Sequence, residues 1–123
     1  MVEGMSETPS FPEVFFRWLE TAQRFPMFDV WREGTLCSIK LVHILDLSPT
    51  DRNIFMHRLR LQGFFPSSFL PLGYDAFGNL LLWDMDSDEV YLHWRGTPPN
   101  RRLKVAPTLK SLCEKMYYRP IHG

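Results

Sequence analysis

Two short apolar runs separated by a polar turn limit the possible folds of this chain more than any other pattern in it. The first run covers residues 69–72, the second covers residues 80–83, and the sequence Asp-Ala-Phe-Gly-Asn occupies residues 75–79 between them. Gly78 falls where a tight turn requires a positive φ angle, which glycine adopts without steric cost. The spacing therefore predicts an antiparallel β-hairpin.

A third strand is predicted over residues 89–94, after an acidic bend at residues 84–88. Side chains alternate between the two faces of a strand, so Val90 and Leu92 share one face and Tyr91 the other. This strand and the hairpin form a three-strand antiparallel meander. A separate earlier strand is predicted after Gly34, where apolar and polar residues alternate over residues 37–42.

Three helices are predicted around these strands. The first helix is predicted over residues 11–24. It begins at a capping-box pattern, Ser10 to Glu13, with proline in the first turn. A second helix is expected after the cap and proline signals of residues 47–51, and Gly63 ends it. Its exposed side carries a basic cluster: Arg52, His57, Arg58 and Arg60. A last helix begins near Thr108, and its apolar face is formed by Leu109, Leu112, Cys113 and Met116.

The elements predict one α+β domain, with an antiparallel β-meander sheet and helices packed on one side. A chain of 123 residues is expected to bury a single core. We place the domain at residues 10–118, after a flexible N-terminus (1–9) and before a C-terminal tail (119–123). No apolar run approaches the roughly 18 residues of a membrane helix, so we expect a cytoplasmic protein without membrane contact.

The charge balance limits the possible partners. Fourteen basic and fourteen acidic side chains cancel, so no overall field attracts phosphate backbones, and direct nucleic-acid binding is not expected. A basic stretch beside Trp94 is predicted to be a solvated loop, with a rim contact to a protein partner as the alternative. Its residues are Arg95, Arg101, Arg102 and Lys104.

The acidic bend begins like a calcium-binding loop, with the pattern D-x-D-x-D at Asp84, Asp86 and Asp88. The continuation fails, because Glu89 stands where the loop needs glycine and Arg95 where it needs a bidentate glutamate. A solvated turn is therefore expected here, and a contact patch for a basic partner is the alternative. We expect no metal and no cofactor.

The sequence contains no recognisable motif for catalysis. The four histidines stand apart in the sequence, without zinc-ligand spacing, and no G-x-S-x-G turn or phosphate-binding glycine loop is present. Cys37 and Cys113 are expected to be buried free thiols. A small enzyme usually shows its acids, bases or metal ligands in such motifs, so we predict a binding protein and not an enzyme.

Three segments resemble the SUKH superfamily, an α+β fold shared by a yeast cell-wall-assembly regulator and many bacterial immunity proteins. Residues 10–19 (SFPEVFFRWL) look like its proline-led helix, residues 69–80 (FLPLGYDAFGNL) are similar to its hairpin, and residues 105–112 (VAPTLKSL) look like its closing helix. The likeness covers residues 10–118. It departs from the family pattern at Pro107, which replaces a small polar residue, and in lacking an additional first helix.

The resemblance implies a single-domain inhibitor or adaptor, in bacteria often encoded beside a secreted toxin, frequently a nuclease, that it neutralises by direct binding. For a nuclease, carboxylates of this chain would occupy the phosphate-binding cleft. A phage or host regulatory adaptor is the alternative, and a metal-dependent enzyme is less favoured. The candidate partner-binding residues lie at the hairpin tip, the acidic bend and the last strand: Tyr74, Asp75, Phe77, Asp84, Asp86, Asp88, Glu89, Tyr91, His93 and Trp94.

Overall fold

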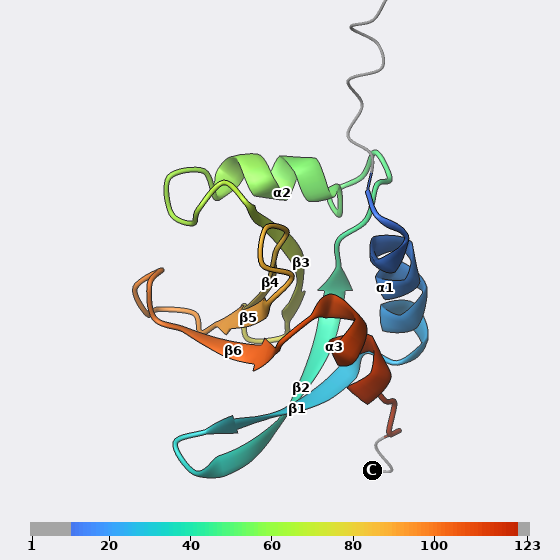
Figure 1. Cartoon of the computed structure of the whole chain (residues 1–123), viewed down its shortest axis with the longest axis vertical. Helices are drawn as coiled ribbons and strands as arrows, with labels where there is room; N and C mark the ends of the chain where they lie inside the picture. Colours follow the sequence, from blue (N-terminus) through green and yellow to red (C-terminus); the bar gives the residue numbers. More distant parts are fainter. Residues whose placement is uncertain (1–10, 121–123) are drawn as a thin grey trace, which may run out of the picture.

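The computed structural model describes residues 11–120 and contains three helices and a six-stranded antiparallel sheet (Figure 1). The elements follow in the order α1 (Glu13–Arg24), β1 (Met27–Arg32), β2 (Thr35–Ile44), α2 (Ile54–Arg60), β3 (Phe69–Asp75), β4 (Leu80–Asp84), β5 (Val90–His93), β6 (Arg102–Ala106) and α3 (Leu109–Lys115). Each strand pairs with the next one in the chain. The predicted α+β class is therefore confirmed. The expected N-terminus (1–9), Ser10 and residues 121–123 of the expected tail lie outside the described residues.

The first helix forms where its apolar spacing predicted, and it buries Phe15, Trp18 and Ala22. The predicted capping box is wrong, because the helix begins at Glu13 and its N-cap is Pro12, which makes no side-chain cap hydrogen bond. Pro12 has an extended backbone, with ψ at 158°, so the helix cannot include it.

The second helix begins later than predicted. Asn53 caps it, since its Oδ1 accepts hydrogen bonds from the backbone N–H groups of Phe55 (3.1 Å) and Met56 (3.2 Å). The residues expected to cap the helix form a separate turn instead, in which the Asp46 carboxylate accepts from the backbone N–H of Ser48 (3.0 Å). Side chains bonded within that turn are not available to start a helix.

The last helix is confirmed, and it buries Leu109, Leu112 and Cys113. Its N-terminus is closed by a capping box in which the Thr108 side chain accepts from the backbone N–H of Ser111, and the Ser111 side chain accepts from that of Thr108. These bonds satisfy N–H groups that the first turn leaves without partners.

The sheet is larger than predicted, because β1 and β6 were not expected. Arg95 and Arg101 of the basic stretch lie outside the strands, as predicted for a loop, but Arg102 and Lys104 belong to β6. This strand pairs with β5, with His93 opposite Arg102 and Leu92 opposite Leu103. Leu103 packs against the main core while Lys104 stays exposed, so the alternation of a half-buried strand lies hidden among charges.

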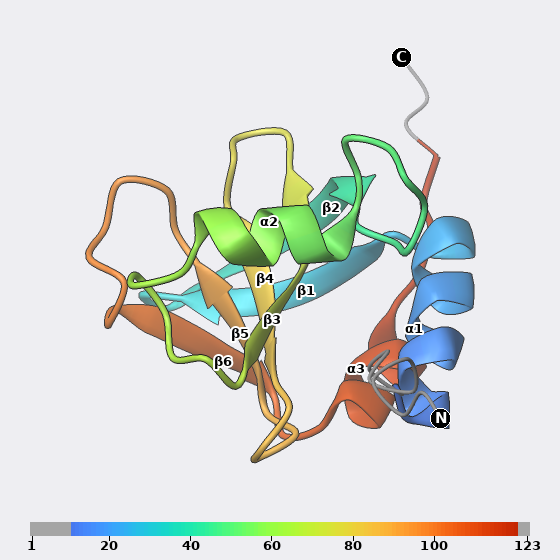
Figure 2. The ribbon, with the colours of Figure 1, turned by 90° about the horizontal axis from the view of Figure 1, so that it is seen from above.

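The two faces of the sheet are covered differently. On the first face α1 and α3 contact each other and enclose the main core, which includes Trp18, Leu72 and Leu92. On the second face Phe69, Leu80 and Leu82 form a smaller cluster with residues from the loop after α2. Figure 2 shows α2 crossing over β3 and β4, away from α1 and α3. The expected packing on one side thus holds for α1 and α3.

Candidate functional site

The ten predicted partner-binding residues do not form one surface. Five lie at or beside the β3–β4 turn, or at the end of β5 that meets it: Tyr74, Asp75, Phe77, His93 and Trp94. Four lie at the other end of β4, in the acidic bend: Asp84, Asp86, Asp88 and Glu89. Tyr91 pairs with Leu82 between them. Figure 2 shows these two loops projecting from opposite ends of the sheet.

Asp75 holds the β3–β4 turn together. Its buried carboxylate accepts hydrogen bonds from the backbone N–H groups of Phe77 (2.9 Å) and Asn79 (2.8 Å), and from the Asn79 side chain (2.9 Å). Gly78 has the positive φ predicted for it, 83°. All of the bonds of Asp75 are internal, whereas the side chain of Phe77 is 75% exposed. Within this turn, Phe77 is the residue available to a partner.

Asp88 has a structural role in the acidic bend. Its Oδ1 accepts from the indole Nε1–H of Trp83 (2.8 Å) and from the backbone N–H of Leu109 (3.2 Å). Its own φ is +69°, a left-handed conformation that aspartate tolerates better than most residues. Asp88 therefore ties the bend to the start of α3.

Asp84 is also bonded within the bend. Its carboxylate accepts from the backbone N–H of Asp86 (3.0 Å) and from the hydroxyl of Ser87 (3.0 Å). Partial burial raises the pKa of Asp84, but hydrogen bonds from Ser68, Asp86 and Ser87 outweigh it and hold that pKa below its ordinary value.

Glu89 is bonded to the neighbouring strands. It accepts from the hydroxyl of Tyr91 (2.6 Å) and pairs with the ammonium of Lys104 (3.0 Å). The bonds from Tyr91 and Lys104 lower the pKa of Glu89, and the same carboxylate raises the pKa of Tyr91. Among residues 11–120 no three His, Cys, Asp or Glu side chains are grouped to hold a metal.

The remaining predicted residues also have neighbours in the chain. The hydroxyl of Tyr74 lies 3.3 Å from Nδ1 of His57, and burial raises the pKa of Tyr74. The Nε2 of His93 lies 2.8 Å from the carbonyl oxygen of Thr97. The ring of Trp94 lies under the guanidinium of Arg32, at 3.9 Å from the ring centre. These side chains stabilise the end of the sheet.

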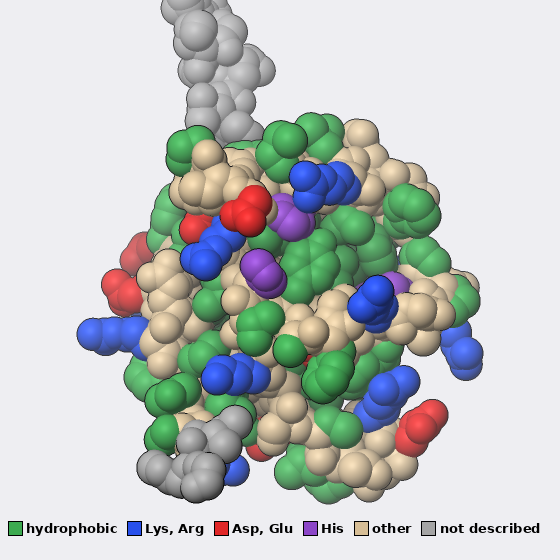
Figure 3. Space-filling view, turned by 180° about the vertical axis from the view of Figure 1, so that it is seen from behind, with side chains coloured by type: hydrophobic (Ala, Val, Ile, Leu, Met, Phe, Trp, Pro, Cys, Tyr) green, Lys and Arg blue, Asp and Glu red, His purple; other side chains and the backbone are tan. Residues whose placement is uncertain are grey.

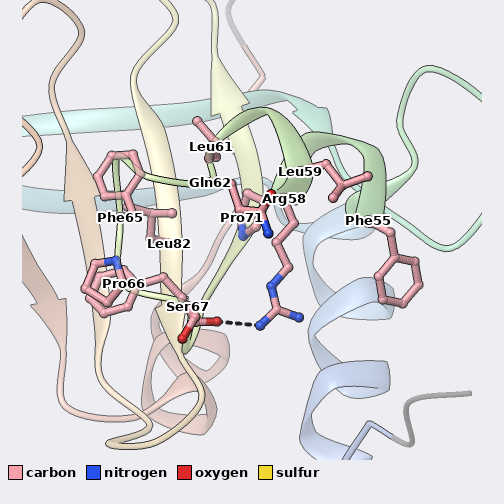
Figure 4. A pocket seen from close by; sticks show the side chains of 11 residues that line it. Phe55, Arg58, Leu59, Leu61, Gln62, Phe65, Pro66, Ser67, Pro71 and Leu82 are labelled. Carbon is pink, nitrogen blue, oxygen red and sulfur yellow. Dashed lines mark hydrogen bonds between the residues drawn. The ribbon is translucent and has the colours of Figure 1, made fainter. Parts of the chain in front are cut away.

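The structure contains a groove that the sequence did not predict, between α2 with its following loop and the second face of the sheet (Figure 4). Its volume is about 390 Å³. The helix contributes Phe55, Arg58 and Leu59. The loop contributes Leu61, Gln62, Phe65, Pro66 and Ser67. The strands contribute Phe69, Pro71 and Leu82. None of the ten predicted residues lines it.

Arg58 lines this groove, and Arg102 lies beside it, over the ring of the lining residue Phe69. The guanidinium of Arg58, half-buried in the lining, donates to the carbonyl oxygen of Ser67. The guanidinium of Arg102 lies over the rings of Phe69 (4.6 Å) and Tyr91 (5.4 Å). Within residues 11–120, Lys104 and Glu89 form the one ion pair. Arg58 and Arg102 therefore have no carboxylate partner in that part of the chain.

A signal for the groove was present in the sequence. Leu59, an apolar residue of α2 that lines the groove, stays 59% exposed although Ile54 on the same helix is buried. Phe64, in the following loop, is 63% exposed. Apolar residues beyond those that a helix needs for its own packing indicate a contact surface.

Comparison with known proteins found no relationship: no family model, no curated protein and no solved structure matches the chain. None of the helices in the described region is long and apolar enough to cross a membrane.

Proposed function

We propose that this chain is a non-catalytic protein-binding domain that acts in the cytoplasm as an immunity protein, neutralising a cognate bacterial toxin by direct contact. The observation that carries the proposal is the open apolar groove beside α2, with aromatic side chains in its lining and an arginine at its edge. Aromatic residues and arginine are enriched at protein interfaces and provide most of the binding energy there. The SUKH resemblance supplies the class of partner.

The exposed residues beside the groove support the same proposal. Leu59 lines the groove and is 59% exposed, and Phe64 in the adjoining loop is 63% exposed. Burying such side chains against a partner contributes about 25 cal/mol for each Å² of apolar surface removed from water. A rigid sheet with a groove at its second face therefore provides a preformed surface, which lowers the entropy cost of binding.

The test is direct binding between the purified protein and the toxins encoded beside its gene. We expect one of these toxins to bind and to lose its activity in proportion to the fraction bound, measured by calorimetry and by an activity assay. If none of them binds, the immunity function is refuted.

A further inference from the structure

We propose that the groove beside α2 is the partner-binding site, and that it takes an acidic segment of the partner in which a large apolar side chain lies next to a carboxylate. This inference rests on the proposed function, because it assumes a protein partner. It reverses the charge expected from the sequence, which placed carboxylates of this chain against a basic partner.

The size and lining of the groove determine the apolar half of this ligand. A volume of about 390 Å³ lies near the lower end of the range for ligand pockets, roughly 300–1,000 Å³. The walls include the rings of Phe65 and Phe69, which stack on each other with centres 6.5 Å apart. This space accepts one or two large side chains of a short segment, whereas a folded element would rest on its rim.

The two arginines determine the acidic half. A guanidinium has five N–H donors, and the hydrogen bonds of Arg58 and Arg102 within the described chain go to the carbonyl oxygens of Ser67 and Pro99. No aspartate or glutamate lines the groove. A carboxylate matches the fork of a guanidinium in a bidentate pair, and partial burial strengthens that pair.

A histidine also lies near the groove. The molecule seen from behind carries basic and histidine side chains among hydrophobic ones over its middle, and its acidic side chains lie mostly toward the left of that view (Figure 3). His93 lies beside the groove, with its ring 5.2 Å from that of Phe65. The carboxylates of Asp84, Asp88 and Glu89 accept hydrogen bonds from other groups of the chain, and within residues 11–120 none of them forms an ion pair with Arg58 or Arg102.

Two matched pairs of variants test the site. Leu59→Glu places a negative charge in the groove, and Met56→Glu makes the same change on the same helix at an exposed residue outside the groove lining. Arg102→Gln removes the cation beside the groove, over Phe69, and Arg101→Gln removes its exposed neighbour in the sequence. Circular dichroism and urea unfolding establish that each variant is folded. The arginine pair provides an independent result if the helix variant does not fold.

The probe is a phage-displayed random peptide library selected on the wild-type protein. We expect enriched peptides to carry a large apolar residue beside Asp or Glu. Their affinity should fall at least about tenfold for Leu59→Glu and Arg102→Gln, and stay within about twofold for Met56→Glu and Arg101→Gln. No enrichment, enrichment of basic peptides, or equal binding to all variants overturns the proposal.

The cognate toxin separates this inference from the proposed function. If a toxin binds the wild-type protein and Leu59→Glu equally well, the groove is not the site, although the immunity function stands. If the peptides behave as expected and none of the neighbouring toxins binds, the immunity function fails and the groove remains a site for acidic segments.

Discussion

The two loops at the ends of β4 and the groove beside α2 use charged side chains in opposite ways. In the loops Asp75, Asp84 and Asp88 accept hydrogen bonds from the surrounding chain. At the groove Arg58 and Arg102 have no carboxylate partner within residues 11–120. A charge whose hydrogen bonds are made internally stabilises the fold, whereas one with unused donors at a cavity is available to a ligand.

Replacement of Asp75 tests the structural role of the first loop with the largest expected effect. Asp75→Ala leaves three N–H donors near a buried position without their acceptor, so we expect the free energy of unfolding to fall by about 3–4 kcal/mol. Urea unfolding measures the change. Phe77→Ala in the same turn is the control, with a cost below about 0.5 kcal/mol. Similar costs for both would contradict the role given to Asp75.

The acidic bend gives the second prediction. Asp88→Ala removes the acceptor of Trp83 and Leu109 and places alanine at a φ of +69°, so a loss of about 2–3 kcal/mol is expected. Asp86 lies in the same bend and its side chain makes no hydrogen bond within the described residues, so Asp86→Ala should cost less than about 0.5 kcal/mol. Equal losses in thermal unfolding would show that the bend is not a structural tie.

Two adjacent phenylalanines, Phe64 and Phe65, test which side chains build the wall of the groove. Phe65 packs on Phe69 and His93, and Phe65→Ala should lower the free energy of unfolding by about 2 kcal/mol because its ring is only partly buried. Phe64→Ala removes a ring that is 63% exposed and should change stability by less than about 0.5 kcal/mol. Chemical denaturation of the two variants decides, and a greater cost at Phe64 would refute the packing described.

The smallest effect concerns acid stability. The pKa of Asp84 is lowered in the folded protein, so its contribution is present above the ordinary aspartate pKa and is lost as pH falls through the lower folded value. Below about pH 4 the melting temperature of Asp84→Asn should therefore decline less steeply than that of the wild-type protein. Asp86→Asn is the matched control. A wild-type slope in Asp84→Asn would exclude this contribution.

Much of the fold was predictable because its signals are local. Gly78 has the φ that its turn requires, and Thr108 caps the helix that follows it. The strand β6 was missed because the charges of Arg101, Arg102 and Lys104 concealed its alternation, which appears once Leu103 packs against the main core.

The site was less predictable, because it depends on contacts between distant parts of the chain. Asp88 looks like a solvated acid in sequence, and its bond to Leu109, 21 residues later, defines its role. The groove likewise joins α2 to Phe69 and Leu82 of two strands. A spacing rule within one element does not describe such a juxtaposition, although the excess of apolar residues on α2 was visible.

The order of the strands has a consequence for how the protein is made. Every strand pairs with its neighbour in the chain, and closing the short loops, such as that between β3 and β4, costs little chain entropy, while the longer connection between β2 and β3 contains α2. The contact between the two ends of the domain is different, since Tyr117 bonds to Asp29 across 88 residues and α3 packs on α1. The sheet can therefore assemble while the chain leaves the ribosome, and the core beneath α1 closes only after α3 has been synthesised.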